Sequence, residues 1–72
     1  MSNDEYIDVD VIIRARTGKG VLLSPQADPQ HKDWISRKRI HRDDAGSIDV
    51  CKLDDEISVR IAEFAARKAG LI

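Results

Sequence analysis

The most constraining feature of this sequence is a regular alternation of apolar and polar residues just after the N-terminus. Apolar side chains occupy every second position from Ile7 to Ala15, and aspartate or arginine fills the positions between them except at Ile12. A period of two places these apolar side chains on one face of an extended strand. The sequence therefore predicts a β-strand of about ten residues with one face in a core.

Turn signals divide the following segment into shorter elements. Residues 17–20 are glycine-rich and predict a hairpin turn, which joins the first strand to a second strand at residues 21–23. Both prolines of the chain fall within residues 24–33, which we expect to form a loop of about ten residues. Residues 34–40 contain a tryptophan and two isoleucines, and they predict a third strand.

The last third of the chain predicts one more strand and a helix. Residues 43–47 indicate a turn and residues 48–53 a fourth strand. Apolar residues then recur at helical spacing, which predicts a helix from about residue 55 to residue 69. Gly70 is placed to end this helix in the left-handed conformation. The predicted helix also contains two glutamate–arginine pairs in the favourable i,i+4 order: Glu56 with Arg60, and Glu63 with Arg67.

Together these elements predict an α+β fold of the order ββββα. We expect a four-stranded antiparallel meander or small open barrel, packed against one C-terminal helix. The chain of 72 residues is long enough for a single small domain, with residues 1–5 as a disordered tail. Chains this short bury only about 60% of the surface that they expose when unfolded. Such a core leaves little room for a catalytic cleft, so we predict that the protein is not an enzyme.

Charge and cysteine content limit the classes of partner and the compartment. Twelve Lys and Arg against thirteen Asp and Glu give a net charge of −1, so no global field attracts nucleic acid or an anionic membrane. Cys51 is the only cysteine, which excludes an intramolecular disulfide. The N-terminus is polar and lacks the apolar region of a signal peptide, and no apolar run is long enough to span a bilayer. These features predict a cytoplasmic protein without a membrane partner.

Few residues in the sequence could carry catalysis or hold a metal. Cys51, His31 and His41 have none of the spacings of a zinc site or of a nucleophile with its base. We therefore predict no catalytic residue, no metal and no cofactor, and keep a metal or Cys–His site built on these three residues as an alternative. Residues 18–20 are Gly-Lys-Gly but precede a predicted strand rather than a helix, so they do not match a phosphate-binding loop.

The densest functional signal is a basic cluster at residues 37–42, which follows Trp34. Basic side chains beside an aromatic ring can hold a phosphate backbone while a base stacks on the ring. On a strand, Arg37 and Arg39 would share one face and Lys38 the other. Three interpretations remain open: a solvated strand face, a nucleic-acid contact, or a contact with an acidic protein surface. The candidate partner-binding residues are Trp34, Arg37, Arg39, Arg42, Arg14, Arg16, Gln30 and His31.

Trp34 has two interpretations of its own. The neighbouring Ile35 and Ile40 favour a role as a core anchor. If the ring is instead exposed beside the long loop that carries Gln30 and His31, it becomes the best candidate for an interface hot spot.

Two stretches of the chain are similar to a group of small, uncharacterised phage and prophage proteins. In that group a strand has the approximate sequence Val-Trp-Ile-Pro-Lys-Ser-Gln-Ile, and a C-terminal helix ends in Lys-Gly-Leu-Ile. Residues 34–40 match the Trp-Ile start and the closing isoleucine, and residues 61–72 resemble the helix. The chain departs from the group at Ser36, which replaces the proline, and at Ala69, which lies between the lysine and the glycine. The resemblance implies a phage-encoded accessory protein and transfers no catalytic residue.

The sequence thus favours a non-enzymatic protein-binding module of the phage or mobile-element type. By analogy of size and charge, it is similar to inhibitors of host defence, including anti-CRISPR proteins. The alternative is a nucleic-acid-binding module that uses the basic strand face. A homodimer is also considered, because the first strand, from which Ile12 points outward, could be an exposed edge that pairs with a second copy.

Overall fold

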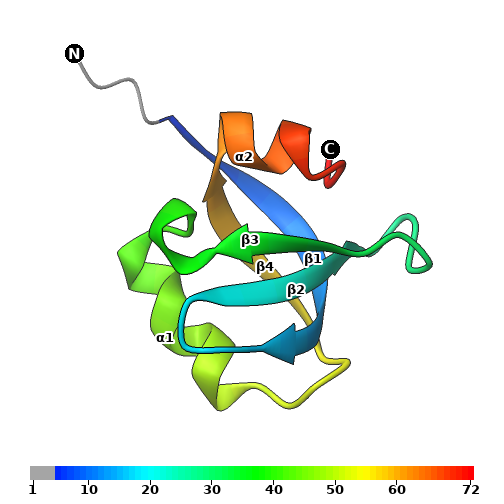
Figure 1. Cartoon of the computed structure of the whole chain (residues 1–72), viewed down its shortest axis with the longest axis vertical. Helices are drawn as coiled ribbons and strands as arrows, with labels where there is room; N and C mark the ends of the chain where they lie inside the picture. Colours follow the sequence, from blue (N-terminus) through cyan, green and yellow to red (C-terminus); the bar gives the residue numbers. More distant parts are fainter. Residues whose placement is uncertain (1–4) are drawn as a thin grey trace.

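The computed structural model describes residues 5–72, which form four β-strands, one short 3₁₀ helix and two α-helices (Figure 1). In chain order the elements are β1 (Tyr6–Arg16), β2 (Gly20–Pro25), β3 (Asp33–Ser36), η1 (Arg37–Arg39), α1 (Arg42–Val50), β4 (Glu56–Ala62) and α2 (Glu63–Lys68). Residues 1–4 of the expected tail lie outside the described residues. Glu5, its last residue, accepts a 2.9 Å hydrogen bond from the Glu63 N–H at its carbonyl.

The four strands form one antiparallel sheet in the order β3-β2-β1-β4. The predicted fold class, an antiparallel four-stranded sheet with a C-terminal helix, is confirmed. The meander order is wrong, because β4 pairs with β1 instead of β3. An isolated bridge joins Ile40, just after η1, to Ile61 of β4. The chain that leaves β3, at one edge of the sheet, therefore reaches β4 at the other edge. The sheet is curled enough for this short segment to connect its two edges.

The first two strands form where the sequence predicts them. The hairpin turn closes through a 2.8 Å bond from Thr17 N–H to Gly20 C=O, and the pairing of β1 with β2 shifts between Ile13 and Ala15. β1 is hydrogen-bonded to β2 on one side and to β4 on the other. The expectation of β1 as a dimerising edge is therefore wrong, and Ile12 is buried.

The segment expected to contain a turn and the fourth strand is the helix α1, so that prediction is wrong. Its first turn carries Asp43 and Asp44, and the Nδ1 atom of His41 accepts from the Asp43 N–H at 3.1 Å. Carboxylates near a helix N-terminus favour the helix. Ile48 is its one fully buried side chain, which anchors α1 to the core.

The predicted helix at residues 55–69 is wrong in its first half, which is β4. The apolar residues Ile57, Val59 and Ile61 alternate, and this period places Val59 and Ile61 in the core against β1. The second half is confirmed as α2, and Gly70 ends it with a φ of +74°.

Apolar side chains from every strand and both α-helices make a single core. α2 contributes mainly alanines, so it packs close to the sheet. In Figure 1, α2 lies on the side of β3 opposite β2, while α1 lies at the other end of the sheet. Neither α-helix in the described part of the chain is long and apolar enough to cross a membrane.

Candidate functional site

The basic cluster does not lie on a strand, contrary to the prediction. β3 ends at Ser36, whose Oγ atom accepts from the Lys38 N–H at 3.3 Å and starts the 3₁₀ helix η1. One turn of 3₁₀ helix spreads three consecutive side chains around its axis. Arg37 and Arg39 therefore do not share one face, and each has its own surroundings.

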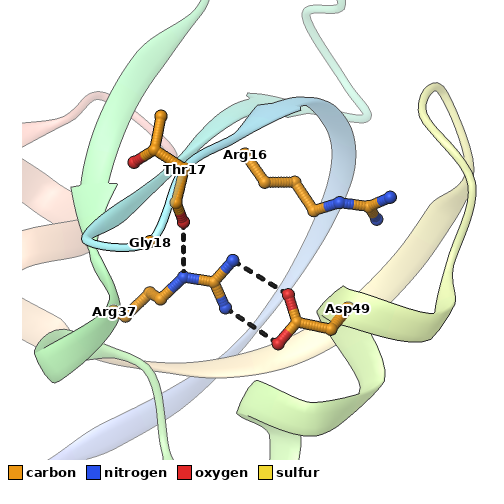
Figure 2. A pocket seen from close by; sticks show the side chains of 5 residues that line it. All are labelled: Arg16, Thr17, Gly18, Arg37 and Asp49. Atoms are coloured by element: carbon orange, nitrogen blue, oxygen red, sulfur yellow. Dashed lines mark hydrogen bonds and ion pairs between the residues drawn. The ribbon is translucent and has the colours of Figure 1, made fainter.

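Arg37 is a structural residue. Its guanidinium donates to both carboxylate oxygens of Asp49 on α1, at 2.9 and 3.1 Å, and its Nε donates to the Thr17 carbonyl at 2.8 Å (Figure 2). The side chain is only 23% exposed. Bidentate pairing of this kind fixes both partners. Arg37 thereby joins the β1–β2 turn to α1, and its charge is paired within the protein.

Two more of the predicted site arginines are also engaged inside the protein. Arg16 donates to the carbonyl groups of Ile48, at 2.8 Å, and Cys51, where the last turn of α1 leaves carbonyl oxygens unpaired. Its side chain lies beside the Arg37–Asp49 pair in Figure 2, and the three residues line one shallow hollow.

Arg14 joins three separate segments. It donates to Asp54 at 2.7 Å, to the Pro29 carbonyl at 2.9 Å and to Ser24 at 3.2 Å. The predicted strand face, on which Arg14 and Arg16 would support Arg37 and Arg39, is therefore not formed, because Arg14, Arg16 and Arg37 are each paired within the protein.

The loop residues of the predicted site differ from each other. Gln30 is exposed between β2 and β3. The Nε2 atom of His31 lies 2.6 Å from the Ala69 carbonyl, so Nε2 carries the proton and donates it. A Cβ atom at Gly70 would lie 2.7 Å from the same nitrogen, so His31 packs directly on the glycine that ends α2. His31 therefore ties the loop to the end of α2.

The alternative metal site is not assembled. Cys51 follows the end of α1, His41 precedes its start, and His31 lies against the residues that end α2. Within residues 5–72, no three His, Cys, Asp or Glu side chains gather in the way that a metal site requires.

The structure brings two of the remaining candidates, Trp34 and Arg39, together with two residues that the sequence did not single out. A groove of about 280 Å³ separates β3 from α2. We call it the aromatic–basic groove. Its lining residues are Asp33, Trp34, Ile35, Ser36, Arg39, Phe64, Ala65, Lys68 and Ala69.

Two of the three aromatic residues of the chain line this groove, and both are half exposed. Trp34 and Phe64 each keep 51% of their surface accessible. The favoured prediction of Trp34 as a core anchor is therefore wrong, and the exposed alternative holds. A Cβ atom at Gly20 would lie 3.1 Å from the Ile35 carbonyl and 3.6 Å from the Trp34 ring, so the ring lies close to the backbone of β2 at this glycine.

The cations of the groove differ from the engaged arginines. The Arg39 guanidinium lies 4.8 Å from the centre of the Phe64 ring, within the range of a cation–π contact. In the part of the chain that the structure describes, no salt bridge involves Arg39 or Lys68. Both side chains are exposed. Their charge is available to a partner.

Arg42, the last of the predicted site residues, lies away from the groove. It is the exposed first residue of α1, beside Tyr6 and His41. Of the eight predicted residues, the structure places only Trp34 and Arg39 in the aromatic–basic groove. Phe64 and Lys68 were missed because they reach the groove only when α2 is a short helix beside β3.

Compared with known protein families, curated proteins and solved structures, the chain gives no match. A proposal for the function therefore depends on the geometry of the groove.

Proposed function

We propose that the protein is a non-enzymatic protein-binding module, acting inside the cell, whose docking surface is the aromatic–basic groove. The observation that carries this proposal is the pair of half-exposed rings, Trp34 and Phe64, beside the unpaired cations Arg39 and Lys68. Aromatic and arginine side chains dominate the binding energy of protein interfaces. Exposed apolar surface that is rimmed by polar residues commonly marks a site of interaction.

The nucleic-acid alternative loses most of its support. That alternative uses Arg14, Arg16, Arg37, Arg39 and Arg42 together. Three of these, Arg14, Arg16 and Arg37, donate to carboxylate or carbonyl groups of the same chain. The remaining cations belong to a chain with a net charge of −1. Phosphate recognition depends on several free cations along a track.

On the resemblance of residues 34–40 and 61–72, we place the module among phage- or mobile-element-type accessory proteins. Inhibition of a host defence system, as by an anti-CRISPR protein, is one role that such a docking module would serve. Such a module would act by covering a surface of its target, and it would not need to catalyse a reaction.

The experiment compares a groove variant with a matched control. The groove variant carries Trp34→Ser and Arg39→Glu. The control carries Leu53→Ser and Arg42→Glu, since Leu53 is 52% exposed and Arg42 also makes no salt bridge within residues 5–72. Each purified protein is immobilised and exposed to nuclease-treated cell extract, and retained proteins are quantified.

We expect the wild type and the control to retain the same protein, and the groove variant to retain at least about tenfold less, as loss of a hot spot predicts. Equal retention by the groove variant would contradict the proposal. Binding of short oligonucleotides that is lost in the groove variant and falls steeply with salt would favour the nucleic-acid alternative.

A further inference from the structure

One edge of the sheet is open beside the groove. β3 is the last strand on its side of the sheet, and α2 lies beyond its outer edge (Figure 1). The aromatic–basic groove lies between these two elements. An open edge is a template on which another extended chain can form backbone hydrogen bonds. The groove thus combines a strand edge with aromatic and basic side chains.

The register of β3 shows which backbone groups face that edge. The Arg37 N–H donates to the Lys19 carbonyl at 3.0 Å, and Val21 is opposite Ile35. In an antiparallel pair, alternate residues turn their backbone groups toward the partner strand. Ile35 therefore faces β2, whereas Trp34 and Ser36 direct their N–H and C=O groups away from it.

One backbone acceptor and one backbone donor at this edge remain for a partner. The Trp34 N–H is already engaged, because it donates to the Asp33 carboxylate at 2.8 Å. The Trp34 C=O and the Ser36 N–H remain, two residues apart on the same edge. A single residue of a parallel strand can bond both of them, through its own N–H and C=O.

The side chains around this edge define the chemistry of the segment. Arg39 and Lys68 provide two unpaired positive charges, and Asp33, the acidic residue of the lining, is held by a backbone N–H. The half-exposed rings of Trp34 and Phe64 offer apolar contact between the strand edge and α2.

From these observations we infer that the partner presents an extended acidic segment, which adds as a strand to the edge of β3 within the aromatic–basic groove. The inference rests on the proposed protein-binding function and specifies the part of the partner that docks. A single-stranded nucleic acid could also contact the rings and cations, but it would leave the Trp34 carbonyl and the Ser36 N–H unused.

Ser36 allows a direct test of the strand addition. Its φ of −63° and ψ of 137° are those of proline, so Ser36→Pro removes the N–H at the edge without a change in backbone conformation. Ser36→Ala is the matched control, because both variants lose the hydroxyl that caps Lys38 and only the proline loses the N–H. Thermal unfolding of both variants verifies that they are folded.

The probe is a displayed library of random dodecapeptides, selected on the immobilised whole protein. The selected sequences are made as synthetic peptides and titrated against the wild type, Ser36→Pro, Ser36→Ala and Trp34→Ser. We expect enrichment of Asp and Glu among them. Ser36→Pro should weaken binding about fivefold relative to Ser36→Ala, as expected for the loss of one backbone hydrogen bond. If Ser36→Pro does not fold, single N-methylation along the peptide replaces it. The expected result is a loss of binding at one position, that of the N–H that bonds the Trp34 carbonyl.

Selected peptides without acidic enrichment would overturn the inference, and so would equal affinity for Ser36→Pro and Ser36→Ala. If these peptides still lose binding with Trp34→Ser, the groove remains a protein-binding site and the proposed function stands. A twelve-nucleotide oligothymidine that binds the wild type but not Trp34→Ser would overturn both.

Discussion

The two edges of the sheet have opposite surroundings. At the β4 edge, Ile40 bridges to Ile61, and the His41 N–H donates to the Arg60 carbonyl at 2.8 Å. The Asp44 carboxylate accepts both the backbone N–H and the Nε of Arg60, each at 2.9 Å. At the β3 edge, only the Trp34 N–H is engaged, by its own neighbour in the chain.

This difference separates stability from recognition. The chain that leaves β3 turns through η1 and closes the far edge with backbone and carboxylate groups, as proteins commonly do to prevent edge-to-edge association. The same turn directs Arg37 inward and Arg39 outward. Substitutions at the closed edge should therefore lower stability, and those at the open edge should affect binding.

The largest effect is expected at Ile40, which is buried at the closed edge. Ile40→Ala removes the side chain beside the bridge to Ile61, and the free energy of unfolding should fall by about 3 kcal/mol, as for other large-to-small core changes. The exposed Trp34 of the open edge is the comparison, since Trp34→Ala should cost less than about 1 kcal/mol. Urea unfolding measures both. A larger loss with Trp34→Ala than with Ile40→Ala would reverse the comparison.

The next effect separates two arginines of η1. Arg37→Ala breaks the contacts with Asp49 and Thr17, and should lower the free energy of unfolding by about 1–2 kcal/mol. Arg39→Ala loses only the exposed contact with the Phe64 ring and should stay within about 0.5 kcal/mol. Binding of a groove-selected peptide should show the opposite order, with Arg39→Ala the weaker binder. If Arg37→Ala had the larger effect on both the free energy of unfolding and peptide binding, the two arginines would not differ in role.

The smallest effect is the pH dependence at the closed edge. Hydrogen bonds from the Arg60 side chain and backbone lower the pKa of Asp44 below its ordinary value of 3.8. A lowered pKa in the folded state stabilises the protein above the ordinary pKa, and this stabilisation disappears as the pH falls through the folded value. The stability advantage of the wild type over Asp44→Asn should therefore be constant near neutral pH and decrease below about pH 4. An advantage that grows on acidification would show that Asp44 is not stabilised as a carboxylate.

Much of the fold could be predicted where the signal is local. The alternation in β1, the glycine-rich turn before β2, and Gly70 at the end of α2 each depend on neighbours in the chain. β4 could not be distinguished from a helix, because Ile57 and Ile61 fit both a period of two and helical spacing. Pairing with the distant β1 decides between them.

The site could be predicted only in part, for a similar reason. The basic cluster marks cations but does not show which of them are neutralised. Arg37 is neutralised by Asp49, which belongs to a helix that the sequence pattern did not predict, and Arg16 is engaged by carbonyl groups at the end of that helix. Because every residue has a backbone carbonyl, the sequence does not show which carbonyl groups pair with an arginine. Phe64 joins Trp34 only through the position of α2 beside β3.

Amide hydrogen exchange, measured by NMR with and without a groove-selected acidic peptide, tests the contrast between the edges most directly. The Arg60 N–H is held by Asp44, whereas the Ser36 N–H faces the open edge. In the free protein, Ser36 should exchange much faster than Arg60, and the peptide should slow Ser36 while leaving Arg60 unchanged. Slow exchange at Ser36 in the free protein, or no change there on peptide binding, would contradict an open edge that recognises a strand.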